Sequence, residues 1–431
     1  MKKKPSILIV NSIPSHHIVP VAEALYRLLG DNLRVVFNEP VDDERKAMGW
    51  NDNWRDYPWI IRTWESEHAN AEFHRLVDES DALVCSEYYT YGNPEWIRRR
   101  LANSQLCFTY CERHWKPSRK LWTLKPTLTD RPRIIRLPIH YYRLLKHMRI
   151  AQSMNADKCH MLAMGAYAAW DEARIGMFHN RMWTWGYFVE DSTSKRSEPG
   201  DIATILWAGR MLDWKCVDTL LYALAEVKER GLRFRAKIVG DGPERDYLVK
   251  LQNDLHLSSE VEILPFMKSG EIRLLMAQTD IYVLPSNYEE GWGAVINEAM
   301  TEGCAVIACD GAGAAPVLIN HGDNGFRFPV CSVKDLAKHL AYLIADRDKS
   351  WEMGNRARQY IEQLWSPDVG AARLVSLING LLGWGNMPQF QEGPCSRAQI
   401  IKPALKNRFR PVLTYEQGSC GCLQTEEKTT P

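Results

Sequence analysis

The sequence predicts an α/β protein of two doubly wound domains, and three observations support this prediction. Apolar runs typical of strands alternate with amphipathic helices from Ser6 to Met164. A polar segment with Pro and Gly follows at 190–200, and a second strand–helix series begins at Ile202. The length of 431 residues is enough for two or three domains. Strict alternation of strand and helix predicts parallel sheets with helices on both faces.

The first domain is predicted at residues 1–195. Its opening βαβ unit has a helix with Pro at its start and Gly30 at its end. The expected elements, in chain order, are the strand Ser6–Asn11, the helix Pro20–Leu29 and the strands Leu33–Phe37, Asp81–Cys85 and Leu106–Tyr110. Folds of this kind bind ligands at the carboxyl ends of their strands.

Two groups of ionisable residues lie at such strand ends. His16 and His17 follow the first strand, where a polar start to the helix and a contact with an acceptor both remain open. The segment after Tyr110 carries Glu112, Arg113, His114 and Lys116. A solvated loop is the alternative for this segment, but its position favours a functional site.

Residues 131–149 form a basic segment without a single acidic residue. Its bases are Arg131, Arg133, Arg136, Arg143, Lys146 and Arg149, interleaved with Leu, Ile and Tyr. A basic, partly amphipathic segment of this kind can lie on an anionic membrane surface. The alternative is an exposed helix whose charges are balanced by neighbours in space.

The second domain is predicted at 196–365, after the linker. Its expected strands are Ile202–Ala208, Phe234–Val239, Val261–Leu264, Ile281–Leu284 and Ala305–Ala308. A separate helix, Val369–Leu382, falls within a short unit at 366–384 that could pack elsewhere. The tail at 385–431 is rich in Pro, Gly, Gln, Ser and Thr, so we expect it to be poorly ordered.

Composition excludes several other classes of protein. The net charge of +1 gives no global field for nucleic acid. No apolar run is long enough for a membrane span or a signal peptide, and the 11 scattered cysteines are typical of a reducing cytoplasm. We therefore expect a cytoplasmic protein, with attachment to the inner face of the membrane as an option. Without a CxxC pair or a His/Cys cluster at zinc spacing, we expect no metal and no cofactor.

The stretch Ser286–Met300 combines a strand end, a glycine turn and the start of a helix. Free N–H groups and the positive end of the helix dipole favour an anion at such a place. Glu290 stands before the glycines and Glu298 two turns into the helix. Carboxylates accept hydrogen bonds from sugar hydroxyls, so the stretch indicates a ligand that is part phosphate and part sugar.

Two further loops of the second domain are expected at the same sheet edge. One contains Arg210 and Lys215, which can hold two phosphates, and the other is the turn Gly240–Gly242. Together these loops spell G-R-x-x-x-x-K, V-G-D-G-P and E-G-W-G-A-V-I-N-E-A-M. In these motifs, with their E-x7-E pair, the chain resembles the retaining nucleotide-sugar glycosyltransferases of family 4, also called group 1. The resemblance implies the GT-B fold, in which two Rossmann-like domains face a cleft.

The resemblance implies roles for residues of the second domain that contact the nucleotide-sugar donor. Arg210 and Lys215 would bind the diphosphate. Backbone N–H groups of Gly291, Trp292 and Gly293 would reach phosphate or sugar.

The remaining donor contacts implied by the resemblance concern the sugars and the base. Glu290 would meet hydroxyls of the transferred sugar, and Glu298 those of the ribose. Phe266 and Met267 lie where the backbone of the family meets the base, and Gly240 lies in the neighbouring phosphate-side turn.

The first domain matches the family only in outline, because it has Ile13-Pro-Ser-His-His in place of the usual glycine pair. The resemblance places Glu112 beside the reacting carbon, with His114 as the alternative. Arg113, Lys116 and the two histidines of the first loop are candidates for the acceptor side.

The implied reaction moves a hexose from a UDP- or GDP-sugar to a saccharide or lipid-linked acceptor, in the synthesis of a surface polysaccharide or glycolipid. Fixed cations would stabilise the leaving diphosphate without a metal. A hydrolase would need its two carboxylates on opposite sides of a bond, whereas Glu290 and Glu298 share one side. A sugar phosphorylase, an epimerase, or a subunit or sensor that binds a nucleotide-sugar without transferring it are the alternatives.

Charge reversal at Arg143, Lys146 and Arg149 is expected to weaken binding to anionic vesicles, because basic groups near such a surface are attracted to it. Co-sedimentation with vesicles of anionic and of neutral lipid measures this effect. Unchanged binding to the anionic vesicles would make the segment an ordinary protein surface.

Overall fold

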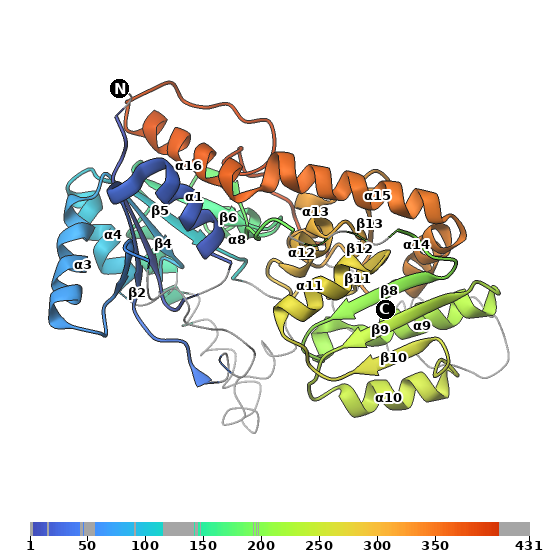
Figure 1. Cartoon of the computed structure of the whole chain (residues 1–431). Helices are drawn as coiled ribbons and strands as arrows, with labels where there is room; N and C mark the ends of the chain where they lie inside the picture. Colours follow the sequence, from blue (N-terminus) through green and yellow to red (C-terminus); the bar gives the residue numbers. More distant parts are fainter. Residues whose placement is uncertain are drawn as a thin grey trace, which may run out of the picture.

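The computed structural model describes residues 3–14, 17–43, 46, 57–89, 92–114, 142, 145–146, 148–192, 194, 196 and 198–404. Two parallel sheets with helices on their faces make up two domains (Figure 1). This confirms the predicted fold class, two doubly wound Rossmann-like domains. His16, Lys116 and most of the basic segment 131–149 lie outside the described residues.

The first sheet has seven parallel strands in the order β3-β2-β1-β4-β5-β6-β7. Their bounds are β1 Ile7–Asn11, β2 Leu33–Phe37, β3 Ile60–Arg62, β4 Ala82–Ser86, β5 Leu106–Cys111, β6 Cys159–Met164 and β7 Met182–Trp185. Helices α1 (Val19–Leu29), α3 (Glu67–Glu79), α4 (Asn93–Ala102) and α8 (Ala168–Ala173) accompany them. Strand β1 is buried along its whole length, which is why its sequence is a continuous apolar run. The short edge strands β3 and β7 have no such run, and the sequence did not predict them.

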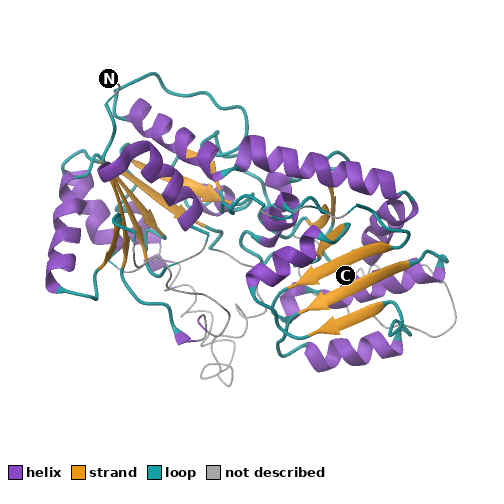
Figure 2. Ribbon diagram, viewed as in Figure 1, coloured by secondary structure: helices purple, strands orange, loops and turns teal. Residues whose placement is uncertain are grey.

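The second sheet has six parallel strands in the order β10-β9-β8-β11-β12-β13. Their bounds are β8 Ala203–Ala208, β9 Phe234–Val239, β10 Val261–Leu264, β11 Ile281–Leu284, β12 Ala305–Cys309 and β13 Gly325–Phe328. The helices between and after them are α9 (Val217–Glu229), α10 (Arg245–Asp254), α11 (Ser269–Ala277), α12 (Val295–Thr301), α13 (Ala315–Leu318) and α14 (Val333–Ala345). Figure 2 shows these strands and helices alternating along the chain.

The strand order reverses direction once in each sheet. In the first sheet β1 lies between β2 and β4, and in the second β8 lies between β9 and β11. Loops that leave the carboxyl ends of such neighbouring strands diverge to opposite faces, which opens a crevice for a ligand. The topology therefore offers one crevice per domain.

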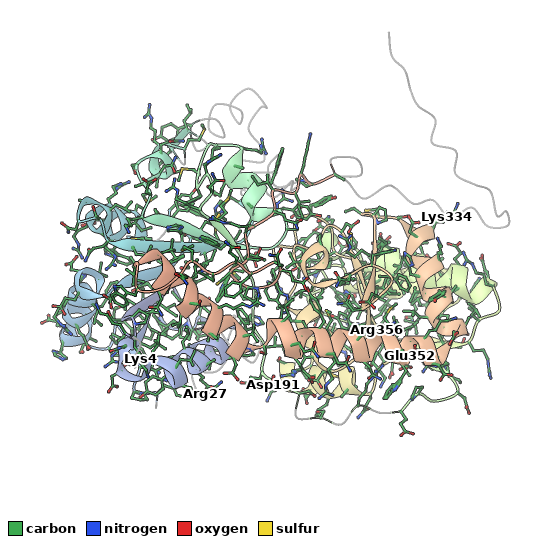
Figure 3. All side chains as sticks on the ribbon, turned by 90° about the horizontal axis from the view of Figure 1, so that it is seen from above. Lys4, Arg27, Asp191, Lys334, Glu352 and Arg356 are labelled. Carbon is green, nitrogen blue, oxygen red and sulfur yellow. The ribbon has the colours of Figure 1, made fainter. Side chains whose placement is uncertain are left out.

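A helical segment connects the two domains on their outer side. Helix α15 (Arg347–Tyr360) continues through a π-helical turn at Ile361–Trp365 into α16 (Pro367–Leu381), which packs on α1 of the first domain. Ser366 caps α16 by accepting a hydrogen bond from the N–H of Val369. In Figure 3 this segment runs along both domains, with Glu352 and Arg356 marking α15 and Arg27 lying near α16. Arg27 forms an ion pair with Asp368 at 2.6 Å.

The tail after Gly385 corrects a prediction. Poor order was expected there, but residues 385–404 are packed on the protein, and Cys395 and Ser396 are buried. The segment pairs antiparallel with the edge strand β7: Cys395 N–H donates to Thr184 O and Thr184 N–H donates to Ser396 O, both at 2.8 Å. Its polar composition hid this pairing, because backbone groups supply the contacts. The rest of the tail, 405–431, lies outside the described residues.

One apolar cluster extends through both domains. It joins Trp185 and Phe188 of the first domain to Trp292 of the second and to Trp365 of the connecting turn. Within the described part of the chain, no helix has the length and apolarity needed to cross a bilayer.

Truncation after Trp384 is expected to lower the melting temperature, because it exposes the edge of β7 and removes three backbone hydrogen bonds to Met182 and Thr184. Each such bond contributes about 1 kcal/mol. Thermal unfolding of this variant is compared with that of a chain truncated after Ala404, which keeps every one of these contacts. Equal melting temperatures for the two truncations would show that the segment adds no stability.

Candidate functional site

The crevice of the second sheet is bordered by three loops that follow β8, β9 and β11. The first two touch so closely that only glycine fits between them. A Cβ on Gly240 would lie 1.9 Å from the carbonyl oxygen of Gly209, and one on Gly242 would lie 2.5 Å from that of Met211. Gly240 and Gly242 also have φ of +146° and +150°, which side chains disfavour. The V-G-D-G-P motif is therefore a packing requirement of these loops.

Lys215 and Glu290 meet across this crevice. The Nζ of Lys215 lies 2.5 Å from Oε2 of Glu290, and the two side chains are only 16% and 11% exposed. Lys215 ends a 3-10 turn at Asp213–Lys215, and its ammonium lies 4.3 Å from the centre of the Trp214 ring. The loop is fixed to its neighbour because Asn287 N–H donates to Trp214 O at 3.0 Å. Arg210 is exposed on the same loop.

Glu298 lies on α12 and is 8% exposed. Among the residues that the structure describes, none forms a hydrogen bond or ion pair with its carboxylate. Burial raises its pKa, Arg273 acts in the opposite direction, and the neighbouring charge of Glu302 adds to the rise. A carboxylate buried in this way is unfavourable unless hydrogen-bond donors reach it.

Glu112 of the first domain reaches the glycine loop of the second. A Cβ on Gly291 would lie 1.5 Å from Oε2 of Glu112, so Glu112 can keep this position only while residue 291 has no side chain. Tyr187 donates its hydroxyl to Oε1 of Glu112 at 3.3 Å. On the other side of the loop, a Cβ on Gly313 would lie 1.9 Å from the carbonyl oxygen of Gly291. The structure thus brings Glu112 and the predicted donor loop into direct contact.

Trp292 has a second role that the sequence did not reveal. Its fully buried indole fits against Gly186 of the first domain, where a Cβ would lie 2.2 Å from the ring. Its Nε1–H donates to Asn297 Oδ1 at 2.7 Å, and Asn297 donates to the carbonyl oxygen of Tyr187 at 3.1 Å. Trp292 therefore joins the domains, in addition to the backbone role that the resemblance implied. Gly186 and Tyr187 belong to no motif, and Asn297 lies within the E-G-W-G-A-V-I-N-E-A-M motif without a role that the sequence assigned, so only the fold shows what these residues do.

Arg113 is buried in the first domain and approaches the loop after β11 at Tyr288. It is 5% exposed and forms an ion pair with the fully buried Asp171 at 3.6 Å. Its guanidinium lies 5.3 Å from the ring centre of Tyr167 and 5.9 Å from that of Tyr288. Tyr288 belongs to the second domain, so Arg113 also contributes to the contact between domains.

His114 lies in a network of polar side chains within the first domain. Its Nδ1 is 2.9 Å from the hydroxyl of Tyr89, and its Nε2 is 2.9 Å from Oε1 of Glu172. Glu172 is fully buried and also accepts a hydrogen bond from Tyr88 at 3.0 Å. These bonds fix the segment that carries Glu112.

One group of described residues could hold a metal ion. Cys111, His114 and Glu172 each offer a ligand atom, and these atoms lie within 4.8 Å of one another. Metal binding needs the Cys111 thiolate, but burial raises the pKa of this thiol well above its usual value, and Glu172 adds to the rise. The arrangement fits a hydrogen-bonded network better than a metal site.

The remaining predicted residues within the described part of the chain, His17, Phe266 and Met267, lie at separate positions. The ring of His17 stacks on that of Tyr187 with centroids 4.7 Å apart. Phe266 is 46% exposed after β10, and Met267 packs against the apolar cluster. His17 is thus near Glu112 through Tyr187.

Comparison with known proteins supports the interpretation of the second domain. Residues 189–360 match the family described as glycosyl transferases group 1. The chain is 30% identical over 192 residues to the GDP-mannose-dependent alpha-(1-6)-phosphatidylinositol monomannoside mannosyltransferase of Mycobacterium tuberculosis, covering 43% of this chain and 50% of that protein. It is 33% identical over 157 residues to the alpha-D-kanosaminyltransferase of Streptomyces kanamyceticus, covering 36% and 40%. It is also 28% identical over 189 residues to the putative colanic acid biosynthesis glycosyltransferase WcaL of Escherichia coli, covering 42% and 46%. The chain thus spans about half the length of the curated relatives it matches.

Solved structures resemble the whole architecture. Anabaena HepE in complex with UDP has a TM-score of 0.59 at 18% identity, covering 88% of this chain and 98% of that one. Sucrose-phosphate synthase from Thermosynechococcus elongatus has a TM-score of 0.57 at 16% identity, covering 88% and 100%. At these identities the likeness shows the fold, which is the GT-B arrangement. The residues that match the glycosyl transferases group 1 family contain all of β8–β13 and the three crevice loops.

Proposed function

We propose that this chain is a glycosyltransferase that moves a hexose from a UDP- or GDP-sugar to a saccharide or lipid-linked acceptor. The observation that carries the proposal is the buried Glu298 carboxylate, to which no residue in the described part of the chain gives a hydrogen bond or an ion pair. A nucleotide-sugar supplies the missing donors, because its ribose hydroxyls can hydrogen-bond to this group. The proposed reaction retains the anomeric configuration and uses no metal.

The ion pair between Lys215 and Glu290 prepares both residues for the donor. A diphosphate carries more negative charge than one carboxylate, so it draws the Lys215 ammonium to itself. Glu290 is then released to accept hydrogen bonds from hydroxyls of the transferred sugar. Arg210 on the same exposed loop adds a second cation to the diphosphate. As the glycosidic bond breaks, these fixed cations stabilise the growing charge on the leaving group.

Glu112 is the residue proposed to lie beside the reacting carbon. Its carboxylate already touches Gly291, and the hydroxyl of Tyr187 orients it at 3.3 Å. The base of the donor would lie near Phe266 and Met267, at the end of β10. His17 is assigned to the acceptor side because its ring stacks on Tyr187, which is hydrogen-bonded to Glu112.

The names of the relatives support the same class of reaction. The mannosyltransferase is named for GDP-mannose and a phosphatidylinositol-based acceptor, and WcaL is named for colanic acid synthesis. HepE was crystallised with UDP. These names support a hexose donor, leave its base open, and favour a role in surface polysaccharide or glycolipid synthesis. Contact with an anionic membrane through residues 131–149 is part of the proposal.

Lys215→Ala is expected to lower donor turnover about a hundredfold, the usual effect of losing one group that stabilises a leaving oxyanion. Release of UDP or GDP from a panel of nucleotide-sugars measures turnover. The matched control is Lys250→Ala, an exposed lysine on α10 of the same domain.

The panel is first screened by thermal shift, because a ligand at a hundred times its Kd stabilises the fold by about 2.7 kcal/mol. Binding without release on any acceptor would favour a non-catalytic subunit or sensor. No shift with any UDP- or GDP-sugar would contradict the proposal.

Glu298→Gln is expected to weaken donor binding yet raise the melting temperature at neutral and higher pH. Burial raises the pKa of this carboxyl in the folded state, so its protonated form is favoured there. The wild-type chain therefore loses stability as pH rises from the unfolded pKa through the raised folded pKa. The glutamine variant is neutral and escapes this loss, so the difference in melting temperature disappears below the unfolded pKa.

Melting curves of both proteins from mildly acidic to alkaline pH test this expectation, together with nucleotide-sugar affinity. Glu262→Gln, at an exposed position in β10, is the control and should leave both quantities unchanged. A glutamine variant less stable than wild type at alkaline pH would mean that Glu298 has a stabilising partner in the free protein.

A further inference from the structure

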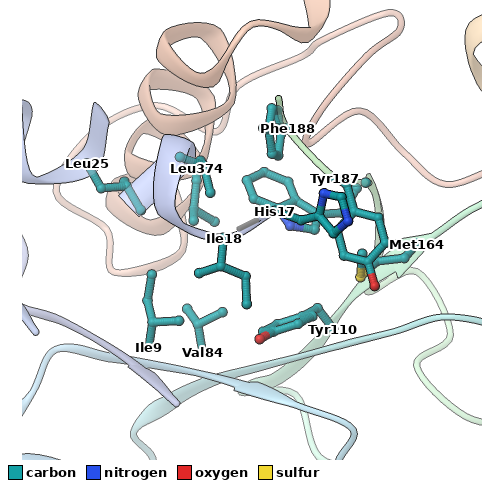
Figure 4. Close-up of a pocket in the computed structure, with 13 residues that line it drawn as sticks. Ile9, His17, Ile18, Leu25, Val84, Tyr110, Met164, Tyr187, Phe188 and Leu374 are labelled. Carbon is teal, nitrogen blue, oxygen red and sulfur yellow. The ribbon is translucent and has the colours of Figure 1, made fainter. Parts of the chain in front are cut away.

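A pocket opens in the first domain beside the candidate active site (Figure 4). It has a volume of about 430 Å³, including the space at its open mouth. Its walls come from β1, β4, β5, β6, β7, α1, α16, the two residues before α1 and the segment after β7.

The location of the pocket is that of a ligand crevice. Ile9 of β1 and Val84 of β4 form its floor, and these two strands are the neighbours at which the strand order of the first sheet reverses. Ligands of open α/β sheets bind at this kind of point. The corresponding place in the second sheet holds the proposed donor site, so the two crevices occupy equivalent positions.

Tyr187 connects the pocket with the reacting groups. Its ring forms part of the pocket wall and its hydroxyl donates to Glu112, which in turn touches Gly291. His17 lies against Tyr187 at the same mouth, as Figure 4 shows. The pocket and Glu112 are thus separated by one side chain, that of Tyr187.

The side chains that line the pocket favour an apolar ligand. Ile18, Val21, Leu25 and Leu374 line its α1 and α16 side, and among the residues that line it only His17, Trp185 and two tyrosines have polar side-chain atoms. A sugar ring has several hydroxyls, and each one left unpaired costs about 1–3 kcal/mol. An alkyl or aromatic group needs no partner and gains about 25 cal/mol for each Å² that it buries.

We infer that this pocket binds an apolar aglycone of the acceptor, a short alkyl chain or comparable hydrophobic group attached to the hydroxyl-bearing sugar. The inference rests on the proposed function and narrows its acceptor from any saccharide to an amphiphilic glycoside. The apolar part enters between α1 and α16, and the sugar remains at the mouth with His17, Tyr187 and Glu112. Reaction at a sugar hydroxyl then leaves the apolar part in place.

The test compares octyl β-D-glucopyranoside with methyl β-D-glucopyranoside, which share a head group and differ only in the aglycone. Calorimetric titrations below the micelle concentration are run with UDP, with GDP and without nucleotide. The octyl compound is expected to bind about tenfold or more tightly than the methyl compound. Equal affinities would overturn the inference.

Two variants that fill the pocket show where the octyl group binds. Ile18→Phe acts at its α1 wall and Leu374→Phe at its α16 wall, and each is expected to abolish the octyl preference. Leu28→Phe adds the same ring to α1 at a position that is 40% exposed and outside the pocket, so it should keep the preference. Thermal unfolding confirms that each variant is folded.

The outcomes separate this inference from the proposed function. An octyl preference that survives in both folded filling variants would mean that the alkyl group binds elsewhere, and would overturn the pocket assignment. If neither UDP nor GDP changes the measured affinities for the two glucosides, this result would count against the glycosyltransferase proposal. The octyl preference measured without nucleotide, and its loss in the filling variants, still tests the pocket in that case.

Discussion

The insertion of Trp292 against Gly186 is the contact on which the arrangement of this molecule depends. The indole leaves the glycine loop of the second domain and becomes part of an apolar cluster with Phe188 and Trp365. Because its backbone belongs to the proposed donor loop, the same residue fixes the loop and the distance between the domains. Glu112 can then touch Gly291 only because neither glycine carries a side chain. The same packing contact therefore fixes both the position of the two domains and the geometry of the site.

The charged side chains of the crevice suit the proposed ligand, and their arrangement lowers the stability of the chain without it. Lys215 and Glu290 neutralise one another, but Glu298 is buried without a partner among the described residues. Removing a carboxylate from water is unfavourable, so this position lowers the stability of the free chain. Such a group is retained where a bound molecule supplies the hydrogen bonds. The apparent defect in stability is therefore the strongest physical argument for a hydroxyl-rich ligand.

The sequence was most informative where a local pattern determines the structure. Buried strands such as β1 appear as apolar runs, and the glycines of the V-G-D-G-P turn mark a backbone approach so close that a Cβ on Gly240 would lie 1.9 Å from a carbonyl oxygen. It was least informative where distant segments meet. The strand β7 and its partner around Cys395 are stabilised by backbone hydrogen bonds, which leave no trace in composition. Tyr187 acquires its role only through contacts between domains, so no spacing along the chain could identify it.

The acceptor side shows the same limit in a different form. Residues that line an apolar pocket have the same composition as residues that fill a core, so Val21 and Leu25 look like the buried face of an ordinary helix. The difference is a missing neighbour, and only the packing of α1 against α16 reveals it. The donor crevice is recognisable from charges and glycines because phosphate and sugar need specific partners. An apolar group needs only space, which explains why the motifs of this chain point to the proposed donor and hardly at all to the proposed acceptor.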